Sequence, residues 1–223
     1  MDEPFPLDET LPVLPGTSPF HVRGIYYIRV RDHAKSLPGG MTQFLDELVD
    51  ARVRDFIQQP FHFMTWYDAF PTLPCGMALA RIRGRPIEPF MRETGRQSML
   101  RLAPSMFRLF SRIGGPRLAA AHAPRLFRNY FDFVELRMYG VNDCEGRGVA
   151  SGIPRYAAAA IVNQAIGLTT GGLESLGATD VQASYRDVRV SGSNGGFPTM
   201  TFTADFRWSL QTLRLAWMNR NRS

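Results

Sequence analysis

The spacing of apolar residues changes along the chain, from a helical period in the first part to the alternation of β-strands later. Apolar residues recur at helical spacing from Thr42 to about Phe56, from Glu88 to Ile113 and from Arg117 to Tyr130, which predicts three helices. Pro104 lies within the second, where a proline should end or kink the helix. Leu73 to Ala80 is expected to form a connecting turn or a short helix.

Strand-like segments occur near the start of the chain and in its last third. Gly24 to Val30 is rich in β-branched and aromatic residues, which predicts a strand. Phe133 to Tyr139 alternates between apolar and charged positions and predicts the first strand of a sheet. Val181 to Val190 and Thr199 to Trp208 are two further strands, joined by a glycine-rich loop at 191–196 that is typical of a hairpin.

Two segments separate these strands. Asn142 to Gly152 is polar and glycine-rich and is expected to be a connection. Tyr156 to Leu176 predicts an Ala-rich helix, which Gly167, Gly171 and Gly172 either split or adapt to close helix packing. The order of elements predicts an α+β fold, with several helices packed on an antiparallel sheet that ends in a C-terminal β-hairpin.

Length and composition predict one domain with two appendages. With 223 residues, 44% of them hydrophobic, the chain can bury a core of its own. Residues 1–21 contain repeated prolines and form an N-terminal arm that should be extended or loosely ordered. Residues 22–210 form the single α+β domain, of a sensory or binding type, and residues 211–223 form a basic C-terminal tail.

The charge of the chain is basic, with 26 Lys and Arg against 20 Asp and Glu. Because Lys35 is the only lysine, the excess follows a bias toward arginine, and no nucleic-acid partner is expected without a local cluster of charge. Arg101, Arg108 and Arg112 would share one helix face, which we interpret as solvated; peripheral contact with anionic lipid is the less favoured alternative.

The sequence carries neither a secretory leader nor an apolar run long enough to span a bilayer, so we expect a cytoplasmic protein. Cys75 and Cys144 lack the spacing of a metal or disulfide motif. His62 and Asp68 could be read as an acid–base pair, but no nucleophile accompanies them. We therefore expect no metal, no cofactor and no enzymatic activity.

The helical region, the segment Arg125 to Phe133, the helix after it and the closing hairpin resemble an uncharacterised paralogous protein family expanded in myxobacteria. The resemblance covers about Val22 to Ser209. That family is distantly similar to haem nitric-oxide-binding domains, to the vinyl-reductase-type small-molecule-binding domain and, through it, to TRAPP vesicle-tethering subunits. The resemblance implies a sensory or scaffolding role, often with dimerisation.

Haem-binding members of this superfamily hold iron through a proximal histidine and the propionates through a Tyr-x-Ser-x-Arg motif. Here the segment Tyr185 to Arg189 has Asp187 in place of the serine, and it follows the last long helix instead of preceding it. His122 is the only histidine after residue 62 and lacks the expected flanking residues. Haem binding is therefore an unfavoured alternative.

The residues favour a non-catalytic small-molecule-binding or sensory module with an apolar pocket between helices and sheet. The candidate lining residues are aromatic, and each is equally consistent with an ordinary core position: Trp66, Tyr67, Phe107, Phe127 and Tyr130. The alternative is a homodimeric scaffold that presents a surface to a partner protein. The possible partners are thus an apolar small molecule, a second copy of the chain or another protein.

Overall fold

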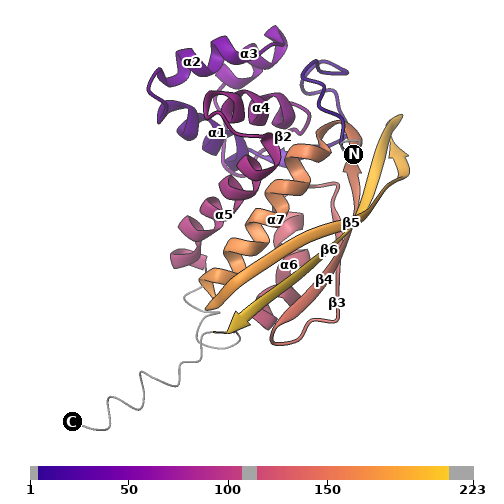
Figure 1. Cartoon of the computed structure of the whole chain (residues 1–223). Helices are drawn as coiled ribbons and strands as arrows, with labels where there is room; N and C mark the ends of the chain where they lie inside the picture. The colour runs from indigo at the N-terminus through magenta and orange to yellow at the C-terminus, as the bar shows by residue number, and fades with distance from the viewer. Residues whose placement is uncertain (1–4, 107–114, 211–223) are drawn as a thin grey trace, which may run out of the picture.

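Helices cover one face of a four-stranded antiparallel sheet in the computed structural model of the chain (Figure 1). The structure describes residues 5–106 and 115–210, with side chains described for 5–101 and 121–210. The sheet has the order β3-β4-β6-β5 and consists of β3 (Glu135–Tyr139), β4 (Glu145–Pro154), β5 (Ala178–Asn194) and β6 (Phe197–Leu210). The predicted α+β class and the C-terminal hairpin are both confirmed.

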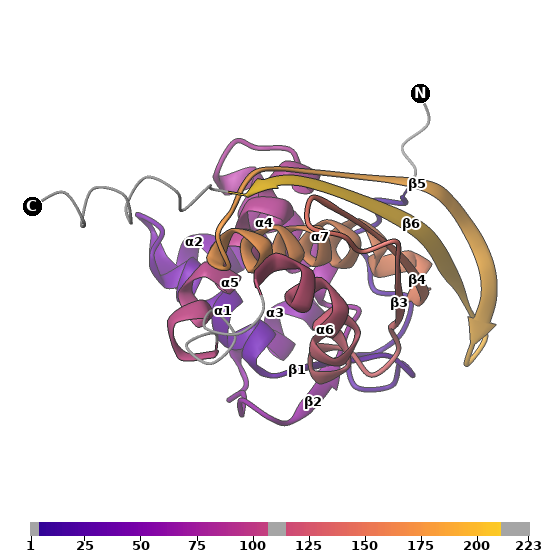
Figure 2. The ribbon, with the colours of Figure 1, turned by 90° about the horizontal axis from the view of Figure 1, so that it is seen from below.

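Helices α6 and α7 lie on the concave face of the curved sheet, whereas α1 to α4 gather beyond one end of it (Figure 1 and Figure 2). The described helices are α1 (Ile25–Lys35), α2 (Gly40–Glu47), α3 (Ala51–Gln58), α4 (Thr72–Ile82), α5 (Ile87–Met106), α6 (Gly115–Tyr130), a 3₁₀ turn η1 (Arg155–Ala157) and α7 (Ala158–Ser175). A separate two-stranded ribbon pairs β1 (His21–Arg23) with β2 (Trp66–Asp68). Val22 of β1 also forms a bridge with Phe131, directly after α6.

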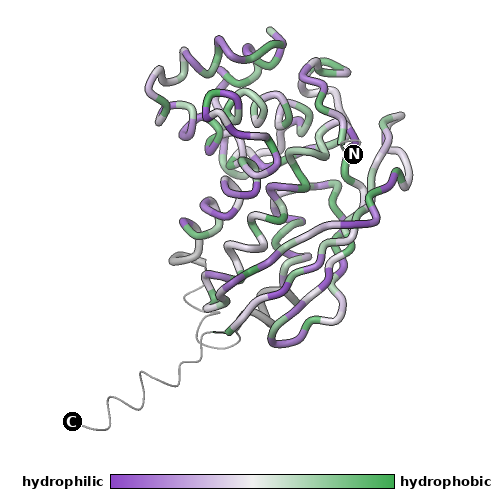
Figure 3. Tube along the Cα trace, in the orientation of Figure 1, coloured by the Kyte–Doolittle hydropathy of each residue, from purple (hydrophilic) through white to green (hydrophobic). Residues whose placement is uncertain are grey.

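The strands alternate between an inner apolar face and an outer polar face, and hydropathy along β5 and β6 changes accordingly (Figure 3). Phe202, Phe206 and Trp208 of β6 are buried on the inner face. Asp205 lies between them on the outer face, where it forms ion pairs with Arg147 and Arg186. The period of two residues therefore places the core between the sheet and the helices.

Helices α5 and α7 approach each other so closely that glycine is required at their contact. A Cβ atom at Gly167 would lie 2.0 Å from the Arg92 carbonyl oxygen, and one at Gly171 would lie 2.5 Å from that of Arg96. Gly95 of α5 has the reciprocal role, with 2.4 Å to the Gln164 carbonyl oxygen. The prediction of close helix packing is confirmed, and α7 is not split.

The predicted strand from Gly24 to Val30 is wrong, because this segment forms α1. Its buried residues are Ile25, Tyr26, Tyr27, Val30 and Ala34. Val30 follows Tyr26 and Tyr27 by four and three residues and precedes Ala34 by four, which puts these side chains on one helix face. The period of burial therefore outweighs the β-propensity of the individual residues.

The single helix predicted from Thr42 to Phe56 is also wrong, since two helices replace it. α2 ends at Glu47, and Leu48 has an extended backbone conformation. Asp50 then caps α3, and its carboxylate accepts the backbone N–H of Arg52. A good N-cap residue in the middle of an apolar pattern marks a new helix start.

The predicted connection from Asn142 to Gly152 is wrong from Glu145 onward, where β4 pairs with β3 and β6. Gly148 lies beneath Met138 of β3, and a Cβ there would lie 3.1 Å from the Met138 sulfur. Glycine in this strand makes room for the large side chains of its neighbour. The hairpin loop is shorter than predicted, because the strands continue to Asn194 and only Gly195 and Gly196 form the turn.

Pro104 does not end its helix as expected, and a second helix also contains a proline. α5 continues past Pro104 to Met106, and α6 contains Pro124. The expected segment from Leu73 to Ala80 is helical, as part of α4. Arg108 and Arg112, which were predicted to share a face with Arg101, lie outside the described residues.

The N-terminal segment 5–20 contains no helix or strand, has several bends and a turn in which the Thr17 N–H bonds to the Leu14 carbonyl, and packs against the rest of the chain. Phe5, Leu11 and Phe20 are buried. The Phe5 ring lies 5.6 Å from that of Tyr185 on the inner face of β5. The segment is further fixed by the carboxylate of Asp68, which accepts the backbone N–H groups of Gly16 and Ser18 and the Ser18 hydroxyl.

Candidate functional site

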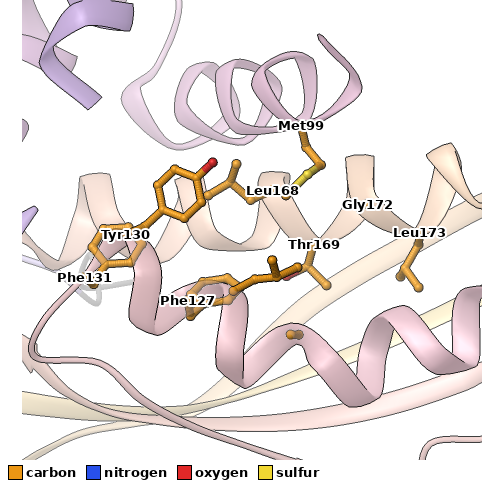
Figure 4. Close-up of a pocket in the computed structure, with 10 residues that line it drawn as sticks. Met99, Phe127, Tyr130, Phe131, Leu168, Thr169, Gly172 and Leu173 are labelled. Atoms are coloured by element: carbon orange, nitrogen blue, oxygen red, sulfur yellow. The ribbon is translucent and has the colours of Figure 1, made fainter. Parts of the chain in front are cut away.

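An apolar cavity lies between α6 and α7, next to the end of α5 (Figure 4). Phe127 and Tyr130 point from α6 toward α7, and Met99 extends from α5 above Leu168. The cavity has a volume of about 30 Å³ and is also lined by Ala123, Phe131, Thr169 and Gly172. Its walls are almost entirely carbon, which favours apolar occupants over water.

A second apolar cavity, also of about 30 Å³, lies next to the first, between α7 and the inner face of the sheet. Phe127, Phe131 and Thr169 line both cavities. The Phe127 and Phe131 rings stack with their centroids 6.1 Å apart and form the partition between them. The rest of the wall comes from α7 and the inner face of the sheet, including Ile161, Leu136, Val134, Phe202 and Phe206.

A third cavity of about 30 Å³ shares Tyr130, Phe131 and Leu168 with the first and extends to α1. It has polar atoms at its edge: Arg29 Nε and Gln164 Oε1 are buried without a hydrogen-bond partner among the described residues. Burial raises the pKa of the Tyr130 phenol, and the charge of Arg29 opposes this shift. The three cavities therefore form one underpacked region with a mainly apolar lining and one polar end.

The region is small in the present conformation. Each cavity admits roughly one or two groups of the size of water, whereas pockets for drug-sized ligands have about 300–1,000 Å³. Because the cavities adjoin at Phe131 and Tyr130, displacement of these side chains would join them.

The structure brings together two of the five predicted lining residues, Phe127 and Tyr130. Trp66 lies in the β1–β2 ribbon, where the Arg23 guanidinium lies 3.6 Å from its ring centroid. Tyr67 belongs to a different aromatic cluster, with its ring centroid 4.8 Å from that of Phe61. Phe107 lies outside the described residues.

Sequence reasoning missed several residues that surround Phe127 and Tyr130. Phe131 is the central one, because it lines all three cavities. Its spacing of four residues from Phe127 was a usable signal, since side chains at i and i+4 meet on a helix. Met99 and Leu168 carried no such signal, because they reach the site only through the packing of α5 on α7.

The described residues offer little catalytic chemistry around this region. Asp68 is buried and uses its carboxylate to hold the backbone near Ser18 and Phe70, while His62 is exposed on a loop. They are not an acid–base pair. No group of three or more metal-binding side chains occurs within 5–101 and 121–210. None of the helices in the described ranges is long and apolar enough to cross a membrane.

Comparison with known proteins gives structural matches only. No protein-family model and no curated protein matches the chain. A Cs H-NOX mutant with 4-cyano-L-phenylalanine matches with a TM-score of 0.58 and 11% identity, over 85% of this chain and 98% of that chain. The chain has the H-NOX fold. Fe(II) unliganded H-NOX from K. algicida matches with a TM-score of 0.58 at 10% identity, over 85% of this chain and 98% of that chain.

An oxygen-binding H-NOX domain related to soluble guanylate cyclases matches with a TM-score of 0.53 and 11% identity, over 83% of this chain and 92% of that chain. These likenesses confirm the predicted similarity to the haem-NO-binding superfamily at the level of the fold. The narrower resemblance to a myxobacterial family stays a prediction.

The residues of this chain do not fit a haem in that fold. His21, His33, His62 and His122 are absent from the walls of the three cavities, so none of these cavities offers an imidazole for the iron. Aromatic rings also occupy the region, leaving cavities of about 30 Å³ each.

The propionate clamp is missing as well. Ile153 to Ala157, directly ahead of α7, contains no Tyr-x-Ser-x-Arg motif. In the segment Tyr185 to Arg189, the Tyr185 hydroxyl donates to Glu88, and Asp187, in place of the motif's serine, pairs with Arg186.

Proposed function

We propose that this chain is a non-catalytic sensory domain that binds a small apolar molecule in the underpacked region around Phe127, Tyr130 and Phe131. The single observation that carries the proposal is that three adjoining cavities with mainly carbon walls meet at these rings. Protein interiors are normally packed to crystal density, so a cluster of voids in one place is informative. The H-NOX fold, whose members named above include an oxygen-binding domain, supports a sensory role by analogy.

Ligand binding would change the position of α6. This helix contributes Ala123, Phe127 and Tyr130 to the first cavity, and Phe127 separates that cavity from the sheet. A ligand larger than the present cavities has to turn these rings, which would move α6 relative to α7. Such a movement changes the surface that α6 presents, which is how a ligand can shift the population of a signalling state.

The proposal is tested with a cavity-filling variant and a matched control on the same helix. Ala123 is buried in the cavity wall, whereas Ala121 is exposed. Ala123→Leu should fill the first cavity, and Ala121→Leu should leave it open. Binding of xenon and of benzene to the purified protein is followed by the change in methyl NMR signals and by the melting temperature, because a ligand that binds only the folded state stabilises it.

We expect both probes to bind the parent protein and Ala121→Leu, with perturbed signals centred on Leu168 and Leu173. Ala123→Leu should weaken binding about tenfold or more, since each 1.4 kcal/mol of lost contact is a factor of ten. Equal binding by the two leucine variants, or no saturable binding to the parent, would refute the proposed site.

The same preparations discriminate the alternative functions. A Soret band in freshly purified protein would establish haem in spite of the misfit described above. A compact dimer that binds neither probe would favour the homodimeric scaffold.

A further inference from the structure

A polar cleft opens between α1 and α5 at the opposite side of Arg29 from the apolar cavities. It has a volume of about 460 Å³, within the range of small-molecule sites. The two helices lie next to each other in both ribbon views (Figures 1 and 2). The segment that joins α4 to α5 closes one end of the cleft with Arg83 and Arg85.

The cleft is strongly basic for its size. Four arginines line it, Arg29, Arg83, Arg85 and Arg101, against the two carboxylates of Asp32 and Glu93. Both carboxylates are engaged: Asp32 lies 3.7 Å from Arg29, and Glu93 lies 3.4 Å from Arg96 and accepts a hydrogen bond from Gln97.

Within the described side chains, Arg83, Arg85 and Arg101 have no ion pair. Guanidinium groups that converge on one cleft without carboxylate partners favour an anion.

Two residues that line the cleft each have a buried nitrogen atom without a partner among the described residues. These atoms are Arg29 Nε and His33 Nε2. A buried polar atom without a hydrogen bond is unfavourable, so such atoms in a natural protein call for an explanation. Arg29 and His33 line the cleft together with the unpaired arginines, so an acceptor bound in the cleft could supply a partner after a small shift of these side chains.

We propose that this cleft binds a small phosphate-bearing metabolite, with its phosphate held by Arg83, Arg85 and Arg101 and reaching toward Arg29 and His33. A phosphate monoester brings close to two negative charges and three acceptor oxygens, which matches several arginines better than the two oxygens of a carboxylate. The proposal is independent of the apolar site. Arg29 and Ser98 line both the cleft and the third cavity, so the anion would contact residues that also border the apolar region.

His33 provides a local probe of occupancy. Burial, followed by the charges of Arg83 and Arg101, lowers the pKa of the imidazole. The other charged groups in the cleft are Arg29, Arg85, Asp32 and Glu93. A bound phosphate would oppose the arginine charges and favour the imidazolium, so the pKa of His33 should rise on binding.

The test uses the full chain and isothermal titration at low salt with adenosine monophosphate, pyrophosphate, inorganic phosphate and succinate as separate probes. The variant Arg83→Gln/Arg85→Gln removes two exposed charges of the cleft. The control Arg137→Gln/Arg207→Gln removes two exposed charges from the strands of the sheet. Circular dichroism checks that each variant is folded.

We expect saturable binding of the two larger phosphates, weaker binding of succinate and an upward shift of the His33 pKa in NMR titrations with pyrophosphate. The cleft variant should lose at least about tenfold in affinity, because hydrogen bonds to charged groups are strong, and the control should lose less than about twofold. Arg101→Gln should weaken binding in the same direction.

Four results would overturn the proposal. They are absence of saturable binding, equal losses in the cleft and control variants, succinate binding as tight as that of pyrophosphate, and an unchanged His33 pKa at saturation. Binding only to phosphatidylcholine vesicles that contain phosphatidic acid, with no binding of soluble phosphates, would also overturn it and would assign the basic surface to lipid headgroups.

Discussion

The close packing of α5 on α7 predicts that Gly167→Ala destabilises the protein, whereas helix propensity alone predicts that the substitution stabilises it. Alanine is a better helix former than glycine by about 1 kcal/mol, so Gly167→Ala would stabilise an isolated helix. In this protein the added Cβ would lie 2.0 Å from the Arg92 carbonyl oxygen. Ordinary carbon–oxygen contacts are about 3.3 Å or more, so the helix backbones would have to separate by about 1 Å.

The size of the expected destabilisation depends on how little the Arg92 carbonyl oxygen can move. The atom that the new methyl group meets belongs to the backbone of α5, which cannot move by a side-chain rotation. Overpacking of this kind is unfavourable by about 1–3 kcal/mol, and the separation also weakens the tight contacts at Gly95 and Gly171. We expect a net loss of about 2 kcal/mol in the free energy of unfolding after the propensity gain is subtracted.

Gly172→Ala is the matched control, because it adds the same methyl group to the same helix. Its nearest neighbour would be Met99 Cγ at 3.8 Å, an ordinary contact. This variant should be neutral or more stable by up to about 1 kcal/mol. Urea unfolding followed by circular dichroism measures both variants. If Gly167→Ala proved as stable as Gly172→Ala, the close approach of the two helices would be wrong.

Two further predictions concern buried polar groups. Asp68→Ala should lower the free energy of unfolding by about 3 kcal/mol or more, because it leaves the buried N–H groups near Ser18 and Phe70 unpaired; Asp55→Ala, at an exposed helix position, should change it by less than about 0.5 kcal/mol in the same urea series. The folded-state pKa of His33 is lowered from 6.5, so its contribution to stability should be complete above pH 6.5 and decrease as the pH falls below that value. In His33→Phe, the free energy of unfolding measured with urea should lack this pH dependence. If the free energy of unfolding changed identically in the parent protein and the variant from pH 7 to 5, the prediction would be wrong.

The parts of the fold that could be predicted are those in which the local pattern and the tertiary environment agree. The alternation from Phe133 to Tyr139 and the pair of C-terminal strands became β3, β5 and β6, because one face of each strand meets the core. The wrong predictions concern segments in which burial in the folded protein outweighs the local secondary-structure propensity. Aromatic residues from Gly24 to Val30 form a helix because their spacing suits burial on one helix face.

The candidate site was only partly predictable for a related reason. Phe127 and Tyr130 belong to one amphipathic helix, so their common location follows from sequence spacing. Trp66 and Tyr67 are equally aromatic, but they belong to a ribbon that pairs with β1 and not with the sheet. The unpaired arginines of the cleft come from α5 and from the segment between α4 and α5, and nothing in their separate neighbourhoods reveals that they line one cleft.

The proline-rich N-terminal segment contributes side chains to the core, although it belongs to neither the helices nor the sheet. Phe20 contacts both Phe70 and Phe197, and Pro19 fits against the glycine turn of the hairpin, where a Cβ at Gly195 would lie 2.8 Å from it. The tip of the β5–β6 hairpin therefore holds the N-terminal segment in place, and the N-terminal segment in turn covers aromatic rings. A shortened protein that began at His21 would expose those rings to water and would tend to aggregate, although every helix and strand were intact.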